Sequence, residues 1–347
     1  MTIVFDPRQL AHVPARELHN GDWTAYNESP ARAEAIRAAL GPAVAAADFG
    51  MAPLQRVHDA EYLAFLQVAH RDWVAAARSG DAIGYTWPVV RRRALDLTRI
   101  DARLGRYSYD AATPIAAGTW EGAYWSAQTA LTALDQVATG VTRRAFALCR
   151  PPGHHAGRDY LGGYCYLNNA AIVAAEARQR GLGPVAILDV DYHHGNGTQD
   201  IFYDDAEMLF VSIHADPATD YPFFWGHADE KGVGAGLGTT LNLPLPRGTG
   251  WDAYAPVLDE ALKAITDYGT RLLVLSFGAD IYAGDPISHF TFAREDIADL
   301  GKRIAATGLP IVTIMEGGYA TDELGYNVKV ITDALLNEDS PTTVRHS

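Results

Sequence analysis

The chain has 347 residues, of which 48% are hydrophobic and 20% charged, so it can bury a full core and is neither disordered nor fibrous. Its formal net charge of -14 disfavours a nucleic-acid partner, and no stretch approaches the roughly 20 apolar residues of a membrane helix. We therefore expect a soluble, cytoplasmic protein that binds neither nucleic acid nor membrane. The two cysteines, Cys149 and Cys165, are too few for a disulfide framework or a thiolate zinc site. Any metal must be bound by histidine and carboxylate side chains.

The first third of the chain shows helical spacing. Ser29 followed by Pro30 predicts a helix start, and an amphipathic pattern runs over residues 60–78. Residues 79–117 mix Gly, Pro and the basic run 91–93, which predicts a long functional loop. We interpret the basic run as a loop or dimer-contact feature, because the chain as a whole is acidic.

From about residue 120 onward, short β-branched or apolar runs alternate with longer segments of helical spacing. Strands are predicted over residues 144–149, 185–188, 208–213, 272–277 and 311–315, and helices over 120–137, 170–180, 254–266, 294–306 and 322–336. This alternation predicts an α/β fold with a central parallel sheet covered by helices. A second long loop is expected over residues 215–240, and the last dozen residues are expected to be a polar tail.

Ionisable or hydroxyl side chains occur at the end of every predicted strand. In strand order these are His154 and His155, then Asp189, Asp191, His193 and His194, then Ser212 and His214, then Asp280, and finally Glu316 and Tyr319. The carboxyl ends of parallel strands meet at the sheet edge where α/β proteins bind ligands. The shared placement predicts an active site there.

Three of these residues form a candidate metal site. Asp191 and His193 are two positions apart, so an extended backbone places both side chains on one face, and Asp280 can join them from another strand. Three protein ligands with an open position are typical of catalytic zinc, and iron(II) or cobalt(II) are alternatives for the same donors. We expect one divalent metal ion, zinc before the others.

The tandem histidines, His154 and His155, are candidates for proton transfer. Asp189 can hold one of them through its Nδ1 hydrogen, and Asn196 can hold the other more weakly. A carboxylate raises imidazole basicity more than an amide does, so the two pKa values are expected to differ, which suits one general base and one electrostatic aid or acid. Tyr319 follows two glycines and could place its hydroxyl against a developing oxyanion.

Taken together, these residues resemble the zinc-dependent deacetylase superfamily, and most closely the bacterial acetylpolyamine amidohydrolases. The matching blocks are RPPGHH at 150–155, GGYCYLNN at 162–169, DVDYHHGNGT at 189–198, Asp280 with DP at 285–286, and EGGY at 316–319. Their order and spacing extend over roughly residues 3–336. The resemblance implies a single arginase/deacetylase-type catalytic domain over residues 1–347, with a loop insertion near 79–117.

The resemblance also implies a role for each matching residue. Asp191, His193 and Asp280 match zinc ligands. His155 matches the general base beside His154, Asp189 and Asn196 match their partners, and Tyr319 matches the tyrosine that polarises the acetyl carbonyl. Asp189, Asp191 and His193 with Ser212 and Ile213 match a potassium or sodium site, and Gly163, Tyr164 and Tyr221 match a tunnel wall. The implied reaction is hydrolysis of an acetamide, in which zinc activates water and a histidine protonates the amine.

Arginases and agmatinases share the implied fold but use two manganese ions. Their pattern has an additional carboxylate at the positions of Gly195 and Gly278, so a two-metal ureohydrolase is not expected. A non-catalytic binding protein is not expected either, because every ligand, histidine and tyrosine of the pattern is present.

Substrate choice depends on residues 79–117, which resemble the insertion by which the polyamine enzymes form a homodimer and narrow their entrance. We therefore expect a small acetylated amine as substrate; the alternatives are acetyl-lysine in proteins or another acylated metabolite. Asp101 and Asp110 are candidates to meet a distal ammonium group. Ala112 stands where some relatives carry an acid.

Overall fold

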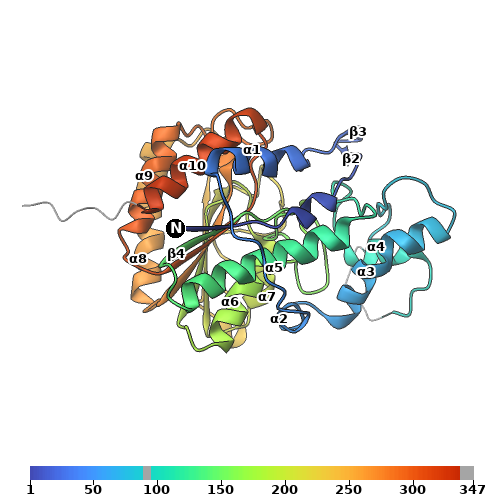
Figure 1. Ribbon diagram of the computed structural model, residues 1–347, viewed down its shortest axis with the longest axis horizontal. Coiled ribbons are helices and arrows are strands. Elements are labelled where there is room, and N and C mark those ends of the chain that lie inside the picture. Colours follow the sequence, from blue (N-terminus) through green and yellow to red (C-terminus); the bar gives the residue numbers. More distant parts are fainter. Residues whose placement is uncertain (89–94, 337–347) are drawn as a thin grey trace, which may run out of the picture.

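The computed structural model describes residues 1–88 and 95–336 (Figure 1). The basic run 91–93 and the predicted polar tail beyond residue 336 lie outside the described residues. Seven parallel strands form the central sheet. In spatial order they are β1 (Thr2–Val4), β4 (Arg144–Ala147), β9 (Ile311–Met315), β8 (Leu272–Phe277), β5 (Val185–Asp189), β6 (Met208–Ala215) and β7 (Thr240–Leu245).

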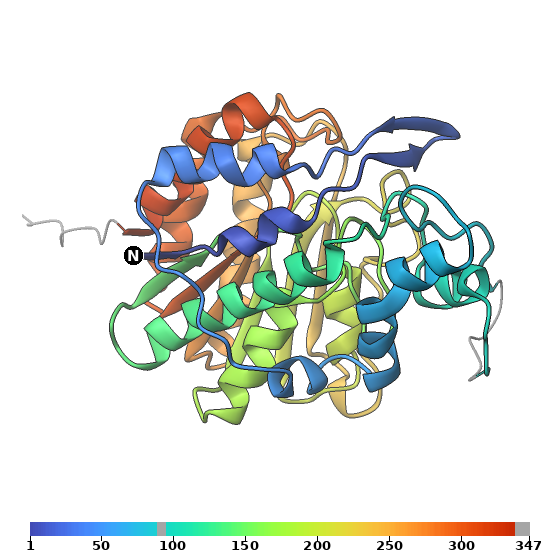
Figure 2. The same cartoon turned by 45° about the vertical axis from the view of Figure 1, so that its right-hand side comes forward.

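Helices cover both faces of this sheet (Figures 1 and 2). One face carries α5 (Thr119–Ala138) and α6 (Asn169–Gln179), and the other carries α1 (Pro30–Leu40), α8 (Trp251–Asp267), α9 (Arg294–Ala305) and α10 (Thr321–Leu336). The helices α2 (Ala52–Gln55) and α3 (Ala60–Ala75) extend the hydrophobic cluster of α5 and α6. In β8, Leu272 and Val274 pack toward the first set, and Leu273 and Leu275 pack toward the second. The strands of the sheet are mostly apolar because both of their faces are buried.

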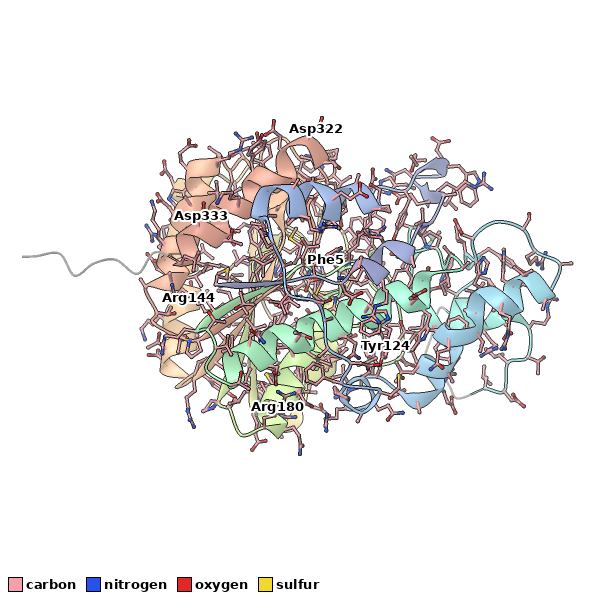
Figure 3. All side chains as sticks on the ribbon, viewed as in Figure 1. Phe5, Tyr124, Arg144, Arg180, Asp322 and Asp333 are labelled. Atoms are coloured by element: carbon pink, nitrogen blue, oxygen red, sulfur yellow. The ribbon has the colours of Figure 1, made fainter. Side chains whose placement is uncertain are left out.

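The outer faces of the helices are polar. In α10, Leu324, Val328 and Ile331 are buried, whereas Asp322 and Asp333 lie on the outer surface (Figure 3). Within the described ranges 1–88 and 95–336, no helix has both the length and the apolar character needed to cross a bilayer.

The predicted fold class is confirmed, and all five predicted strands and all five predicted helices after residue 120 are present. Four strands were missed: the edge strands β1 and β7, and the pair β2 (Arg16–His19) and β3 (Asp22–Ala25), which form a hairpin that projects from the body (Figure 2). β1 is only three residues long, and β7 contains a proline, so both give a weak strand pattern. A short helix, α7 (Asn196–Phe202), was also missed.

The prediction that residues 79–117 form a loop is wrong in part, because they contain α4 (Ile100–Tyr107). This helix packs on α3, where the Tyr107 and Phe65 ring centroids lie 4.7 Å apart. Gly105 permits the contact of α4 with Thr86, since a Cβ at position 105 would lie 1.8 Å from the Thr86 carbonyl oxygen. A glycine and three arginines in or beside two turns of helix hide the helical pattern from sequence reasoning.

Candidate active site

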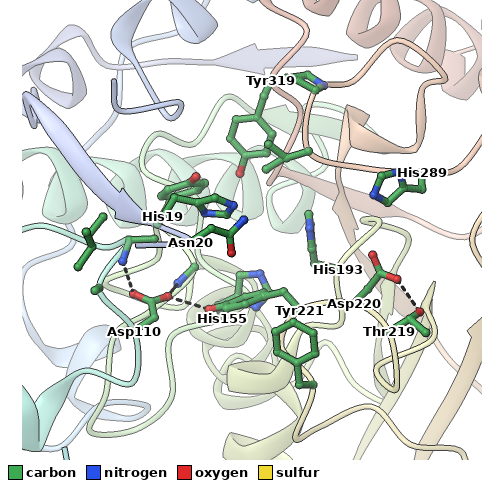
Figure 4. A pocket seen from close by; sticks show the side chains of 18 of the residues that line it. His19, Asn20, Asp110, His155, His193, Thr219, Asp220, Tyr221, His289 and Tyr319 are labelled. Atoms are coloured by element: carbon green, nitrogen blue, oxygen red, sulfur yellow. Dashed lines mark hydrogen bonds between the residues drawn. The ribbon is translucent and has the colours of Figure 1, made fainter. Parts of the chain in front are cut away.

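A cavity of about 500 Å³ opens at the carboxyl edge of the sheet (Figure 4). Asp110 and Ala112 line it, and so do several residues of the predicted site: His155, Gly163, Tyr164, His193, Tyr221 and Tyr319. The residues of the predicted site come from loops after β4, β5, β6 and β9. The fold therefore brings residues more than 150 positions apart to one site.

Three metal donors gather below this cavity. The donor atoms of Asp191, His193 and Asp280 lie within 4.8 Å of one another, and His193 Nδ1 is 3.1 Å from Asp280 Oδ2. Asp191 and His193 follow β5, and Asp280 follows β8, its neighbour in the sheet. Glycines leave room for the carboxylates: a Cβ on Gly278 would be 2.0 Å from Asp191 Oδ2, and one on Gly317 would be 2.6 Å from Asp280 Oδ2.

This donor set fits a divalent cation. Both carboxylates are fully buried, and burial together with the charge of Asp191 raises the pKa of Asp280 to about 7. A buried pair of like charges is stable only when a cation or a proton offsets it. Two carboxylates and an imidazole are donors that zinc accepts.

A second group of potential donors, His154, Cys165 and Glu316, lies within the same distance limit. Its members already have partners in the protein. Glu316 accepts hydrogen bonds from the Gly153 main chain at 2.7 Å and from Ser276 at 3.1 Å, and the Cys165 thiol donates to a main-chain oxygen. We therefore assign this group to the hydrogen-bonded support of the site.

The structure gives each tandem histidine the partner that the sequence predicts for it. His154 Nδ1 lies 3.0 Å from Asp189 Oδ2, and His155 Nδ1 donates to Asn196 Oδ1 at 2.7 Å. Burial lowers the pKa of His154, but the nearby Asp191 and Asp189 charges outweigh it and raise that pKa to about 10. Burial and the neighbouring imidazoles hold the pKa of His155 well below its usual value. The two pKa values thus move apart, with the low one on His155.

The tunnel wall is tied to His155 by close backbone packing. Gly163 has φ +55°, and a Cβ there would lie 2.1 Å from the His155 ring. On the other side, the Tyr221 ring meets the His155 ring edge-on with centroids 5.2 Å apart. Asp110 Oδ2 joins the two sides, because it accepts from the Gly163 main chain at 2.7 Å and from the Tyr221 hydroxyl at 2.9 Å. Asp110 lines the cavity, but its carboxylate bonds within the protein.

Asp101 is not part of the cavity lining, contrary to the prediction that it binds substrate. Its carboxylate pairs with Arg78 at 3.0 Å and with Arg99 at 2.7 Å. Two guanidinium groups neutralise its charge. Within this chain, Asp101 is therefore an ion-pair residue of the insertion.

The residues proposed for a monovalent cation lie together beside the metal donors. Asp189 is paired with Ser212 in the β5–β6 ladder, and Ile213 follows on β6. Asp191 and His193 come directly after β5. The cation itself stays a prediction.

Sequence reasoning missed Arg32, which holds the loop that carries Tyr319. Its buried guanidinium donates to the main-chain oxygens of Gly318 and Glu316, each at 2.6 Å, and lies 4.8 Å from the centre of the Tyr319 ring. Glu28 balances the charge at 2.7 Å. A single arginine in an early helix carries no pattern that would have revealed this contact.

Residues at the mouth of the cavity were also missed. His19 and Asn20 reach the rim from the tip of the β2–β3 hairpin, and Asp220, paired with Arg247 at 2.8 Å, lies on another part of the lining (Figure 4). The hairpin did have a signal, since Asn20–Gly21 is a typical two-residue turn and both residues have positive φ.

Glu17 supports the tunnel wall at a cost in stability. Its Oε1 accepts from the Tyr164 hydroxyl at 3.0 Å, while the buried Oε2 has no hydrogen-bond partner among the described residues. Burial raises the pKa of Glu17 to about 7 from an ordinary value of 4.5. The folded protein thus holds this proton more tightly, so the penalty is absent below the unfolded pKa and grows as the pH rises through 7.

We expect Glu17→Gln to gain stability over wild type as the pH rises. Glutamine cannot ionise, so the difference in unfolding free energy should widen by about 1–3 kcal/mol between roughly pH 5 and pH 8. Denaturant unfolding of both zinc-loaded proteins at several pH values measures it. A difference that stays constant with pH would show that Glu17 does not titrate in this range.

Comparison with known proteins places this geometry in a family. The model of the histone deacetylase domain matches residues 26–335. The chain belongs to the histone deacetylase family. It is 49% identical over 334 residues to acetylpolyamine amidohydrolase 1 of Pseudomonas aeruginosa, covering 94% of this chain and 96% of that protein. It is 44% identical over 333 residues to the acetylpolyamine amidohydrolase of Mycoplana ramosa, covering 94% and 97%.

A solved structure from the same histone deacetylase family supports the fold. The crystal structure of an acetylpolyamine aminohydrolase from Burkholderia pseudomallei superposes with a TM-score of 0.92 at 40% identity, and covers 96% of this chain and 98% of that chain. The family consists of hydrolytic deacetylases, which agrees with the predicted enzyme class. The match extends beyond the site to nearly the whole fold.

Proposed function

We propose that this protein is a zinc-dependent amidohydrolase that removes acetyl groups from acetylated polyamines or similar small acetylated amines. The observation that carries the proposal is the placement of three metal donors, a histidine pair and Tyr319 around one cavity. The names of the similar bacterial proteins support the substrate class.

Asp191, His193 and Asp280 are the residues that would hold zinc. Bound there, zinc supplies Lewis acidity, which polarises an amide carbonyl and acidifies a water molecule. A monovalent cation at Asp189 and Ser212 would support the loop after β5. We also propose that the chain forms a cytoplasmic homodimer through the insertion at residues 79–117.

The chain's own residues supply the proton transfers. Because His155 donates its Nδ1 hydrogen to Asn196, its Nε2 is left to take a proton from water. His154, held by Asp189, contributes positive charge beside the reacting carbonyl, and one of the two imidazoles returns a proton to the departing amine. The Tyr319 hydroxyl points into the cavity, where it can donate to the oxyanion (Figure 4).

The shape of the cavity favours a slender substrate. Tyr164 and Tyr221 line its walls, and apolar side chains there suit the methylene chain of an acylated alkylamine. The hairpin tip and Arg247 restrict the mouth. A folded protein surface would have to present its acetyl-lysine past these residues.

Acetate release by the zinc-loaded enzyme tests the proposal. Acetylputrescine, acetylcadaverine and acetylspermidine are compared with an acetyl-lysine peptide at equal concentration. We expect a clear preference in kcat/KM for the small amines. Preference for the peptide would replace the proposed substrate class by acetyl-lysine, and absence of release from all four would reject the proposed reaction for these substrates.

A further inference from the structure

The side chain that contacts His155 Nδ1 is the amide of Asn196. Its two ends differ, because the oxygen accepts hydrogen bonds and the NH₂ group donates them. Asn196 Oδ1 accepts from His155 Nδ1. If the amide turned by 180°, its NH₂ group would face Nδ1, and His155 would have to carry its proton on Nε2. Nε2 is the nitrogen that the proposed reaction needs free. The orientation of Asn196 therefore decides whether His155 can act as a base.

The Nδ2 end of this amide faces Tyr160. Asn196 Nδ2 lies 3.5 Å from the Tyr160 hydroxyl oxygen, and that hydroxyl donates its single hydrogen to Asp200 Oδ2 at 2.6 Å. The carboxylate is the closer and stronger acceptor, since the main-chain oxygen of Asn196 is 3.5 Å away. Tyr160 consequently presents lone pairs to Asn196. These lone pairs accept from an NH₂ group and repel a carbonyl oxygen.

The Oδ1 end also faces the Tyr109 hydroxyl, whose oxygen is 3.3 Å from Oδ1 and 2.5 Å from the Tyr221 hydroxyl oxygen. The rings of Tyr109 and Tyr160 meet edge-on with centroids 5.5 Å apart, and both pack on Trp225. Asn196 is fully buried and Tyr160 is 8% exposed, so water has little access to replace these contacts. Asp200 lies one turn after Asn196 on α7, which places its carboxylate beside Tyr160.

We propose that Tyr160 and Asp200 are positioning residues that lock the Asn196 amide and, through it, the tautomer of His155 with hydrogen on Nδ1. The role of His155 in this inference rests on the proposed function. A carboxylate at position 196 would need no lock, because both of its oxygens accept hydrogen bonds. The lock is thus needed because position 196 is an asparagine, whose amide must be held in one orientation.

Changing residue 196 distinguishes the proposed lock from a general structural role of Tyr160. We expect Tyr160→Phe to lower kcat about 3- to 10-fold, the size of effect of one neutral hydrogen bond, with KM within about 2-fold and zinc content unchanged. In an Asn196→Asp background, the same Tyr160→Phe change should alter kcat less than about 2-fold, since that carboxylate has no direction to lock. Asp200→Ala, which removes the acceptor of the Tyr160 hydrogen, should resemble Tyr160→Phe.

Tyr107→Phe is the matched control, because it removes a hydroxyl from a buried tyrosine of the neighbouring insertion that packs on Phe65. It should leave kcat unchanged. Equal losses from Tyr160→Phe in the asparagine and aspartate backgrounds would overturn the inference and leave Tyr160 as a packing residue. So would a Tyr160→Phe variant with wild-type kcat.

A measurement that does not depend on turnover decides the inference separately. In protein labelled with ¹⁵N-histidine and assigned with His155→Asn, we expect His155 of the zinc-loaded wild type to carry hydrogen on Nδ1, and Tyr160→Phe to move part of the population to Nε2–H. An unchanged spectrum would overturn the lock. If wild type releases no acetate, the proposed function fails while this spectrum still decides whether the lock exists.

Discussion

Asp280→Ala is expected to lose bound zinc and at least about 10³-fold in kcat/KM, because the Lewis acidity of the metal contributes several kcal/mol to such reactions. Asp280 supplies one of the three donor side chains of this cluster and lies 3.1 Å from His193 Nδ1, so its removal also frees the imidazole. Zinc content by mass spectrometry and acetate release measure the two losses in the same sample.

Asp299→Ala provides a matched control, since it removes a carboxylate from the exposed face of α9, where Asp299 pairs only with Lys302 at 2.8 Å among the contacts that the structure describes. It should keep both zinc and activity. Chelation of the wild type should reproduce the loss, and added zinc should reverse it. An Asp280→Ala protein that retained one zinc ion per chain and full turnover would exclude the assigned metal site.

Tyr319→Phe is expected to bind zinc normally and to lose about 10²–10³-fold in kcat, the usual effect of removing one oxyanion donor. Burial holds the pKa of Tyr319 well above its ordinary value, so the hydroxyl keeps its hydrogen and can donate it. Phenylalanine preserves the ring beside Arg32 and Tyr164, so the loss should lie in turnover. Steady-state kinetics with the preferred small amine measures it.

The same change at Tyr326, an exposed residue on α10, should have no effect on turnover. Retention of more than about a tenth of wild-type kcat by Tyr319→Phe would be too small a loss for an oxyanion donor. Tyr319 would then be a wall residue of the cavity.

A helix or strand could be predicted from the sequence wherever its burial produces a regular pattern of apolar residues along the chain. A strand such as β8, covered on both faces, is apolar from Leu272 to Leu275, and a helix such as α9 repeats its apolar residues every three or four positions, so both patterns are visible without neighbours. The edge strand β1 pairs with only one strand, β4, and its three residues carry no comparable pattern. The helix α4 is stabilised by packing on α3, which the local sequence does not encode.

Site residues that directly follow a strand could be predicted, because the strand itself fixes their positions. Asp191 and His193 share a face because they are two apart, and the parallel sheet brings Asp280 beside them. Contacts made by long-range packing could not be predicted in this way. Asp101 was chosen for its charge, but Arg78, 23 positions away, takes that charge.

The order of strands in the sheet divides the site into two parts with different local stability. The donors follow β8 and β5, which lie in the middle of the seven strands, whereas the rim is built from the projecting hairpin and the end of the insertion. Segments with few buried contacts open locally, while central strands open only when the whole domain unfolds. Amide hydrogens of Leu188 and Leu275 should therefore exchange only on the timescale of global unfolding, and those of the hairpin much faster. The hairpin at the entrance can thus open locally and admit substrates while the metal donors after β5 and β8 keep their positions.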